Sequence, residues 1–222
     1  MKITAALKDF LATEEKRLSG DTFNKYLWVV ELFEDYLANY SSIPKTKPDK
    51  NYGESIITGT VKQITEKEIN EFLNVFVIKK VSSTYNEMRT YLIVLEKFVR
   101  YLLNNDLIDE TKATSLKNTI RDAKNLPKTA KASDLLFALA RNNVLREYSE
   151  ILSGNFVITK IEKYCIGVRE DINHRIISPV LLTEEITATL EENMVLHLEL
   201  GKCEEGWVVI ESGNVYLKLI ET

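Results

Sequence analysis

The apolar residues change their spacing about two thirds of the way along the chain, and this change constrains the fold more than any other feature. Up to about residue 152 they recur every three or four positions, as on one face of a helix. After Ser153-Gly154 they form short runs rich in Val, Ile and aromatic residues, which favour strands. We therefore predict an α+β chain: an N-terminal all-α helical bundle followed by a small antiparallel β-barrel or sandwich.

Polar or proline-containing breaks divide the first part into predicted helices. These are expected at about 3–18, 22–40, 65–78, 83–104, 109–123 and 135–152. Thr65 and Glu68 have the spacing of a capping box. Ser41–Gln63, with its prolines and glycines, predicts a long exposed loop. Leu126-Pro127 predicts an interruption, because proline disfavours helix at the residue before it. Ser133 is then expected to cap the last helix.

Five or six short strands are predicted in the remainder of the chain. They are expected at about 156–161, 164–168, 175–182, 194–200, 207–210 and 215–219. Pro179 suits an edge strand or a bulge. Thr183–Glu192 is expected to form one or two helical turns, and Glu211–Asn214 has the composition of a hairpin turn.

Charge is distributed unevenly along the sequence. Residues 1–133 carry 21 Lys and Arg against 18 Asp and Glu, and residues 134–222 carry 8 against 15. We predict a helical domain over 1–133, and a connecting helix with a small acidic β domain over 134–222. The densest basic stretch, Lys112–Lys131, holds six cations and one acid. Such a run is either a solvated face or a segment that contacts phosphates.

Simple counts exclude several classes of protein. The longest unbroken apolar run, Leu135–Ala140, is far shorter than the roughly 20 residues of a membrane span. The first residues lack the apolar core of a signal peptide. Two cysteines, Cys165 and Cys203, are too few for a disulfide scaffold or a zinc cluster. We therefore expect a cytoplasmic protein with reduced thiols, no metal and no membrane association.

Three stretches of the helical part carry a family resemblance: residues 18–37, 64–73 and 82–108. The first contains Ser19, Thr22 and Tyr26 in a Ser-x-x-Thr-x-x-x-Tyr pattern. In their order and spacing these stretches resemble the N-terminal core-binding (SAM-like) domain of tyrosine recombinases of the phage-integrase and Xer type. The resemblance implies a small bundle that clamps one face of duplex DNA. The Ser41–Gln63 loop is longer than is usual in that family.

The catalytic residues of that family are not found. A tyrosine recombinase needs arginines, a His-x-x-Arg motif and a tyrosine nucleophile to hold and attack the scissile phosphate. His174 and His197 have no arginine three positions later, and an isolated Tyr216 is expected to be a packing residue. Neither a Gly-rich phosphate loop nor a Gly-x-Ser-x-Gly elbow occurs. We therefore predict a protein that is not an enzyme and uses no cofactor.

The resemblance and the basic residues together predict a non-catalytic DNA-binding protein with an accessory or regulatory role, of the kind that accompanies mobile elements. The helical domain would bind duplex DNA mainly through phosphates. The expected contacts are Lys25, Lys79, Lys80, Ser83, Thr84, Arg89, Lys97, Lys117, Arg121, Lys124, Lys128 and Lys131. The acidic β domain would meet a protein partner or a second copy of the chain. The alternative is a protein–protein interaction or regulatory module that does not bind DNA.

Overall fold

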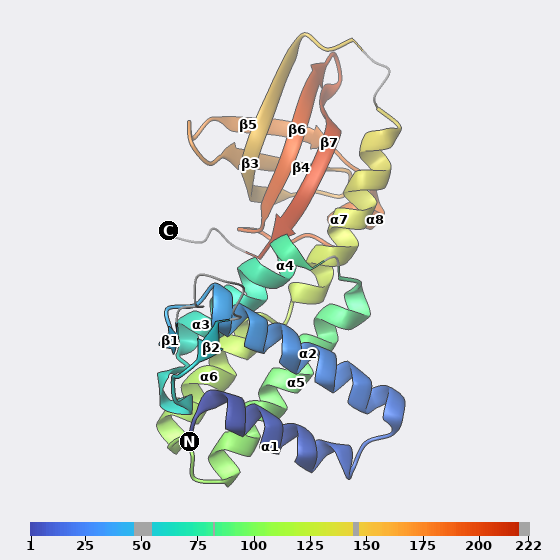
Figure 1. The fold of residues 1–222 in the computed structure, drawn as a ribbon. Coiled ribbons are helices and arrows are strands. Elements are labelled where there is room, and N and C mark those ends of the chain that lie inside the picture. Colours follow the sequence, from blue (N-terminus) through green and yellow to red (C-terminus); the bar gives the residue numbers. More distant parts are fainter. Residues whose placement is uncertain (47–54, 82, 144–146, 218–222) are drawn as a thin grey trace. The chain divides into compact units, whose positions relative to one another are not determined.

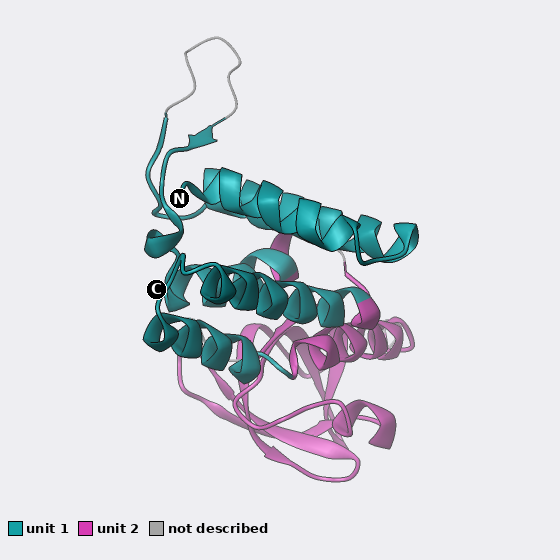
Figure 2. Cartoon of the chain, turned by 90° about the horizontal axis from the view of Figure 1, so that it is seen from below, with its two compact units in different colours: residues 1–77, 87–124 teal, residues 78–86, 125–222 magenta. Residues whose placement is uncertain are grey.

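The computed structural model describes residues 1–46, 55–81, 83–143 and 147–217 (Figure 1). The chain forms two compact units (Figure 2). Unit 1 comprises residues 1–77 and 87–124, and unit 2 comprises residues 78–86 and 125–222. The predicted α+β class, with helices before strands, is therefore confirmed.

Unit 1 is built almost entirely from helices. Its main elements are α1 (Ile3–Glu15), α2 (Gly20–Asn39), α3 (Glu66–Glu71), the π-helical turn η2 (Phe72–Phe76), α5 (Tyr85–Asn104) and α6 (Glu110–Asp122). The short helix α4 (Val77–Lys80) lies where the chain first passes from unit 1 to unit 2.

Aromatic rings form the centre of unit 1. Phe33 of α2 lies with its ring centroid 5.0 Å from that of Phe72 in η2 and 6.5 Å from that of Phe98 in α5. The Phe98 ring also meets Phe10 of α1, at 5.5 Å. All four side chains are buried. Edge-to-face pairs of this kind contribute about 0.5–1.5 kcal/mol beyond the burial of their area, so they tie together helices that are distant in sequence.

The predicted exposed loop over residues 41–63 is only partly a loop. It contains the short paired strands β1 (Lys45–Thr46) and β2 (Ile56–Ile57) and the 3-10 helix η1 (Val61–Gln63), while residues 47–54 lie outside the described residues. Ile43, Ile57 and Val61 are buried. These apolar residues anchor the segment to the bundle, whereas Pro48 and Gly53, two of the residues that predicted turns, lie outside the described residues.

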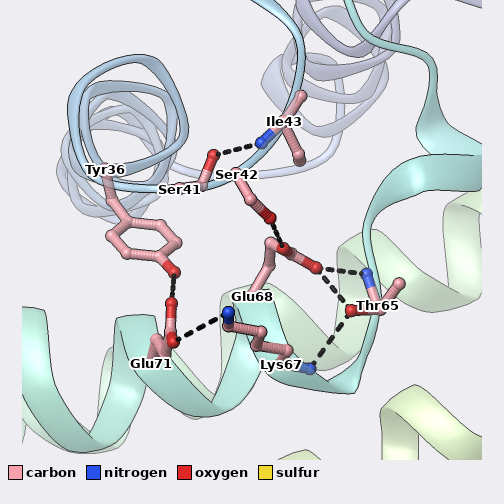
Figure 3. Close-up of polar contacts among 8 residues, drawn as sticks. All are labelled: Tyr36, Ser41, Ser42, Ile43, Thr65, Lys67, Glu68 and Glu71. Atoms are coloured by element: carbon pink, nitrogen blue, oxygen red, sulfur yellow. Dashed lines mark hydrogen bonds and ion pairs between the residues drawn. The ribbon is translucent and has the colours of Figure 1, made fainter. Parts of the chain in front are cut away.

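A network of polar side chains joins α3 to the segment after α2 (Figure 3). The Thr65 backbone N–H and hydroxyl both donate to Glu68 Oε2, at 2.9 and 2.5 Å, and the Lys67 N–H donates to Thr65 Oγ1. The predicted capping box is thus confirmed. Ser42 donates to the other oxygen of the Glu68 carboxylate at 3.2 Å. Nearby, the buried Tyr36 hydroxyl donates to Glu71 at 2.9 Å.

Unit 2 contains the strands and two further helices. Its elements are α7 (Leu126–Arg141), β3 (Glu150–Ile161), β4 (Cys165–Glu170), β5 (Ile176–Leu181), α8 (Glu184–Thr187), β6 (Val195–Cys203) and β7 (Gly206–Tyr216). Helix α8 confirms the one or two turns expected after Thr183.

The five strands form one mixed sheet rather than an all-antiparallel barrel or sandwich. They pair in the order β3-β4-β5-β7-β6, and β6 pairs back onto β3. Four of these junctions are antiparallel, but β5 and β7 are parallel and joined by a single registered pair, Val180 and Trp207. Pro179 has no N–H to donate, which helps to explain why this junction is so short. The sheet therefore curls on itself with one weak seam.

Helix α7 departs from the sequence prediction at both ends. It begins at Leu126, so Pro127 lies in the first turn, where a missing N–H breaks no intrahelical bond. Ser133 is therefore inside the helix and does not cap it. The helix ends at Arg141, and the chain is already in strand β3 at Glu150. Figure 1 shows α7 beside β7.

The same helix changes the position of the domain boundary. The predicted division before Asp134 falls in the middle of α7, whereas the compact units divide between Lys124 and Asn125. Leu136 of α7 is completely buried in the same apolar core as the strands. The connecting helix therefore packs as part of the β unit over its whole length.

The predicted hairpin turn at Glu211–Asn214 is wrong. These residues lie inside the continuous strand β7, and the β6–β7 turn is formed instead by Glu204 and Glu205. Irregularities in the β6–β7 register accommodate the stretch. A Cβ at Gly213 would lie 2.8 Å from the His197 ring, so glycine here makes room for that ring rather than for a turn.

The packing of Gly201 generates a stability prediction. This buried glycine of β6 is covered by the ring of Tyr148, which a Cβ would approach to 2.5 Å, and the Tyr148 hydroxyl donates to the Asn143 carbonyl. We predict that Gly201→Ala lowers the free energy of unfolding by about 1–3 kcal/mol through overpacking, measured by urea denaturation. Gly154→Ala on β3 is the control, because its Cβ would meet nothing within 4 Å. Equal effects of the two changes would contradict this account.

The Glu68 network generates a prediction about pH. Burial acts to raise the pKa of Glu68, but the hydrogen bonds from Thr65 and Ser42 outweigh it, and the pKa lies below its ordinary 4.5. The stabilisation is therefore complete above pH 4.5 and is lost as the pH falls through the lowered pKa. We expect Glu68→Gln to cost about 1 kcal/mol at pH 7 and progressively less in acid. The measurement is urea denaturation from pH 7 to 3, with the exposed Glu15→Gln as control.

Candidate nucleic-acid interface

Two of the predicted DNA contacts, Lys117 and Arg121, lie on one flank of α6, and a third, Lys124, lies in the turn that follows the end of the helix at Asp122. Leu116 and Ile120 are buried and fix the rotation of the helix. Lys117 and Arg121, four residues apart, consequently share one side of the helix, and together with Lys124 just beyond its end we call them the basic flank. Arg121 and Lys124 are exposed, and Lys117 is partly exposed. Within the part of the chain that the structure describes, none of these three side chains forms an ion pair or a side-chain hydrogen bond.

The opposite flank of α6 has a structural role. The Lys112 ammonium donates to the Lys62 carbonyl, and the Ser115 hydroxyl donates to the Glu66 carboxylate of α3. The bond from Ser115 is the main cause of the lowered pKa of Glu66. These contacts fasten α6 to α3 and η1, so the basic flank is carried on a fixed helix.

The remaining candidates in unit 1 differ in their availability. Lys25 on α2 and Arg89 on α5 are exposed. Lys97 on α5 is engaged inside the unit: its ammonium lies 3.8 Å from the buried Glu14 carboxylate and 5.0 Å from the centroid of the Tyr26 ring. Lys97 therefore compensates a buried acid, so its charge is less available to a ligand than those of the exposed Lys25 and Arg89.

Four candidates lie in the short segment of unit 2 before and at the start of α5. Lys79 and Lys80 are exposed, and the Lys79 ammonium lies 5.8 Å from the centroid of the Tyr216 ring. Ser83 and Thr84 precede α5, and both have interaction partners. These residues thus belong to a different compact unit from the basic flank.

The last two candidates, Lys128 and Lys131 on α7, are paired with acids of unit 2. The Lys128 ammonium lies 2.5 Å from Glu191 Oε1, and the Lys131 ammonium lies 3.5 Å from Glu185 Oε1. The basic run from Lys112 to Lys131 looks uniform in sequence but has three parts: Lys112 bonds to the Lys62 carbonyl, the basic flank has no acid paired to it among the described residues, and the lysines of α7 are paired with acids.

An open pocket of about 700 Å³ in unit 1 was not foreseen from the sequence. It is lined by residues of α1, α2 and β2, among them Lys8, Glu31, Glu34 and Asp35. Burial, opposed by Lys8 and reinforced by Glu31, raises the pKa of Glu34 above its ordinary value. The only sequence signal was the spacing of the three acids on one helix, which is equally typical of a solvated face.

The residues considered for catalysis or metal binding are held by separate neighbours. His174 Nδ1 lies 2.9 Å from Arg169 Nη1, and His197 Nδ1 lies 3.0 Å from Asn155 Oδ1. Across residues 1–46, 55–81, 83–143 and 147–217, no group of three His, Cys, Asp or Glu side chains is arranged to hold a metal ion. Over the same ranges, no helix combines the length and apolar character that crossing a membrane requires.

Comparison with known proteins adds no family assignment. The chain matches no family model, and no curated protein or solved structure is significantly similar to it. The core-binding resemblance therefore stays a hypothesis, and any functional assignment depends on the geometry of the molecule itself.

Proposed function

We propose that this protein binds duplex DNA without cleaving it, and that the basic flank of α6 makes the principal phosphate contacts. The observation that carries the proposal is the accessibility of Lys117 and Arg121 on one side of a fixed helix and of Lys124 just beyond its end, with no acid among the described residues paired to them. The resemblance of residues 7–108 to a recombinase core-binding domain supports the same assignment.

The dimensions of the flank suit a phosphate backbone. The four-residue step from Lys117 to Arg121 rises about 6 Å along the helix, which spans about two phosphates of one strand at about 3.4 Å axial spacing. Arg121 can donate two parallel hydrogen bonds to one phosphate, while Lys117 and Lys124 act as point charges. Contacts of this kind give affinity and orientation with little sequence preference.

The proposed role is accessory or regulatory rather than catalytic. The basic flank supplies cations but no nucleophile, and lysine and arginine alone do not provide the His-x-x-Arg and tyrosine chemistry of a recombinase. Lys25 and Arg89 are exposed cations of the same unit and are secondary candidates for phosphate contacts.

The pocket in unit 1 favours a second function, the binding of a basic protein segment. Three carboxylates, Glu31, Glu34 and Asp35, face one lysine across it, and Ile57 provides apolar lining. Charge complementarity then selects a cationic partner rather than DNA.

The proposed function predicts the behaviour of a triple variant. Lys117→Gln/Arg121→Gln/Lys124→Gln should weaken binding to all duplex sequences alike, because phosphate contacts carry no sequence information. The slope of log affinity against log salt should decrease by about 0.9 for each phosphate that the variant no longer neutralises. Fluorescence anisotropy with a labelled duplex of about 20 base pairs, starting at about 50 mM salt, measures both quantities.

The matched control is Lys67→Gln/Arg100→Gln/Lys160→Gln. It removes the same net charge from three cations that are each paired with a nearby acid. The proposal fails if the control weakens binding as much as the triple variant does, or if the unmodified chain does not bind at micromolar concentration.

A further inference from the structure

We propose that Glu185 and Glu191 form an autoinhibitory clamp that holds Lys128 and Lys131 away from nucleic acid. The inference depends on the proposed function, because it concerns how far DNA contact extends beyond the basic flank. The two acids occupy the lysines as phosphates would, so only part of the basic run is available for binding.

The contacts of Glu191 resemble those of a bound phosphate. Its Oε1 lies 2.5 Å from the Lys128 ammonium, and its Oε2 accepts a 2.6 Å hydrogen bond from the Asn125 side-chain amide. Both oxygens are thus engaged by groups at the start of α7. Glu185 lies 3.5 Å from Lys131, one turn further along the same helix.

Buried neighbours hold both acids in place. Glu185 lies in α8, where the Thr183 side chain caps the helix by accepting from the Ile186 N–H. Ile186 and Leu190 belong to the apolar core that includes Leu136 of α7. The residues directly beside Glu185 and Glu191 are therefore anchored against α7, which keeps the carboxylates within reach of its lysines.

The two ion pairs of the clamp compete with phosphates for the lysines, yet a bound polyanion can still displace the carboxylates. The paired side chains are 41% exposed at both Lys128 and Glu191, and 50% and 64% exposed at Lys131 and Glu185. Ion pairs of such exposure contribute little to stability, so a polyanion can replace the carboxylates. The cost of that replacement, together with repulsion between carboxylate and phosphate, reduces the affinity of the intact chain for DNA.

Neutralising the two acids in the full chain tests the proposal. Glu185→Gln/Glu191→Gln should bind the duplex about three- to tenfold more tightly at low salt. Its salt slope should steepen by about 1.8, since two more lysines then neutralise phosphates. Adding Lys128→Gln/Lys131→Gln should abolish this increase in affinity. Glu199→Gln/Glu211→Gln, on paired positions of β6 and β7, changes the net charge equally and should leave the slope unaltered.

A second variant leaves α8 untouched. Lys128→Gln/Lys131→Gln alone should change the affinity of the full chain for the duplex by less than about twofold, because both lysines are already paired with acids. The triple variant of the basic flank should instead weaken binding strongly.

The outcomes separate the inference from the proposed function. If the triple variant of the basic flank weakens binding but Glu185→Gln/Glu191→Gln leaves the affinity and the salt slope unchanged, the clamp is refuted and DNA binding stands. An equal increase in affinity from Glu199→Gln/Glu211→Gln would likewise refute the clamp, since net charge alone would then explain the effect. If neither the unmodified chain nor the clamp variant binds, both proposals are refuted.

Discussion

The packing of α7 against β7 is the interaction on which the rest of unit 2 depends. Leu136 and the small residues Ala132 and Ala140 lie in one core with the strands, and the alanines allow the helix and strand to approach closely. Two polar bonds fix the alignment: the Val215 N–H donates to Ser133 Oγ at 3.2 Å, and the Asn143 amide donates to the Val209 carbonyl at 3.0 Å. The first of these bonds is partly buried and the second is buried, and such bonds favour one register, since removing one partner leaves the other unsatisfied.

This packing also decides which cations are free. Once α7 belongs to the β unit, its lysines lie beside α8 and the acidic segment after it. The net charges of the two halves of the sequence therefore overstate how far basic and acidic residues are separated in the fold. Acids of the second half pair with lysines that precede residue 134. Electrostatic arguments from sequence totals miss such internal pairing.

The long helices could be predicted from sequence because their signals are local. The apolar stripe of α5 and the Thr65–Glu68 box each lie within a few turns of the same helix. The start of α7 cannot be predicted from sequence, because proline is tolerated in the first turn of a helix but disrupts its interior. Which case applies depends on the strand that packs against the helix. Gly213 was misinterpreted for a similar reason, since a glycine that makes room for a ring and one that makes a turn are identical in sequence.

At the candidate site, too, sequence predicts the local arrangement of residues but not their distant partners. The cations from Lys117 to Lys131 are chemically alike, and helical spacing correctly groups Lys117 with Arg121, whereas Lys124 lies beyond the end of α6. Their partners cannot be predicted in this way, because Glu185 and Glu191 follow Lys131 and Lys128 by more than 50 residues. Sequence periodicity describes neighbours on one helix, whereas pairing between distant elements depends on the complete fold.

The division of the chain between its units has a consequence for its synthesis. Residues 78–86 belong to unit 2, yet the rest of that unit follows residue 124. On a ribosome adding about 5–20 residues per second, this segment emerges on the order of ten seconds before β7, the strand against which Lys79 lies. Unit 1 is in turn interrupted by a segment that cannot yet pack. All of unit 1 has been synthesised once residue 124 is added, whereas residues 78–86 must wait for residues 125–222, so this segment reaches its native packing later than the unit that surrounds it in the sequence.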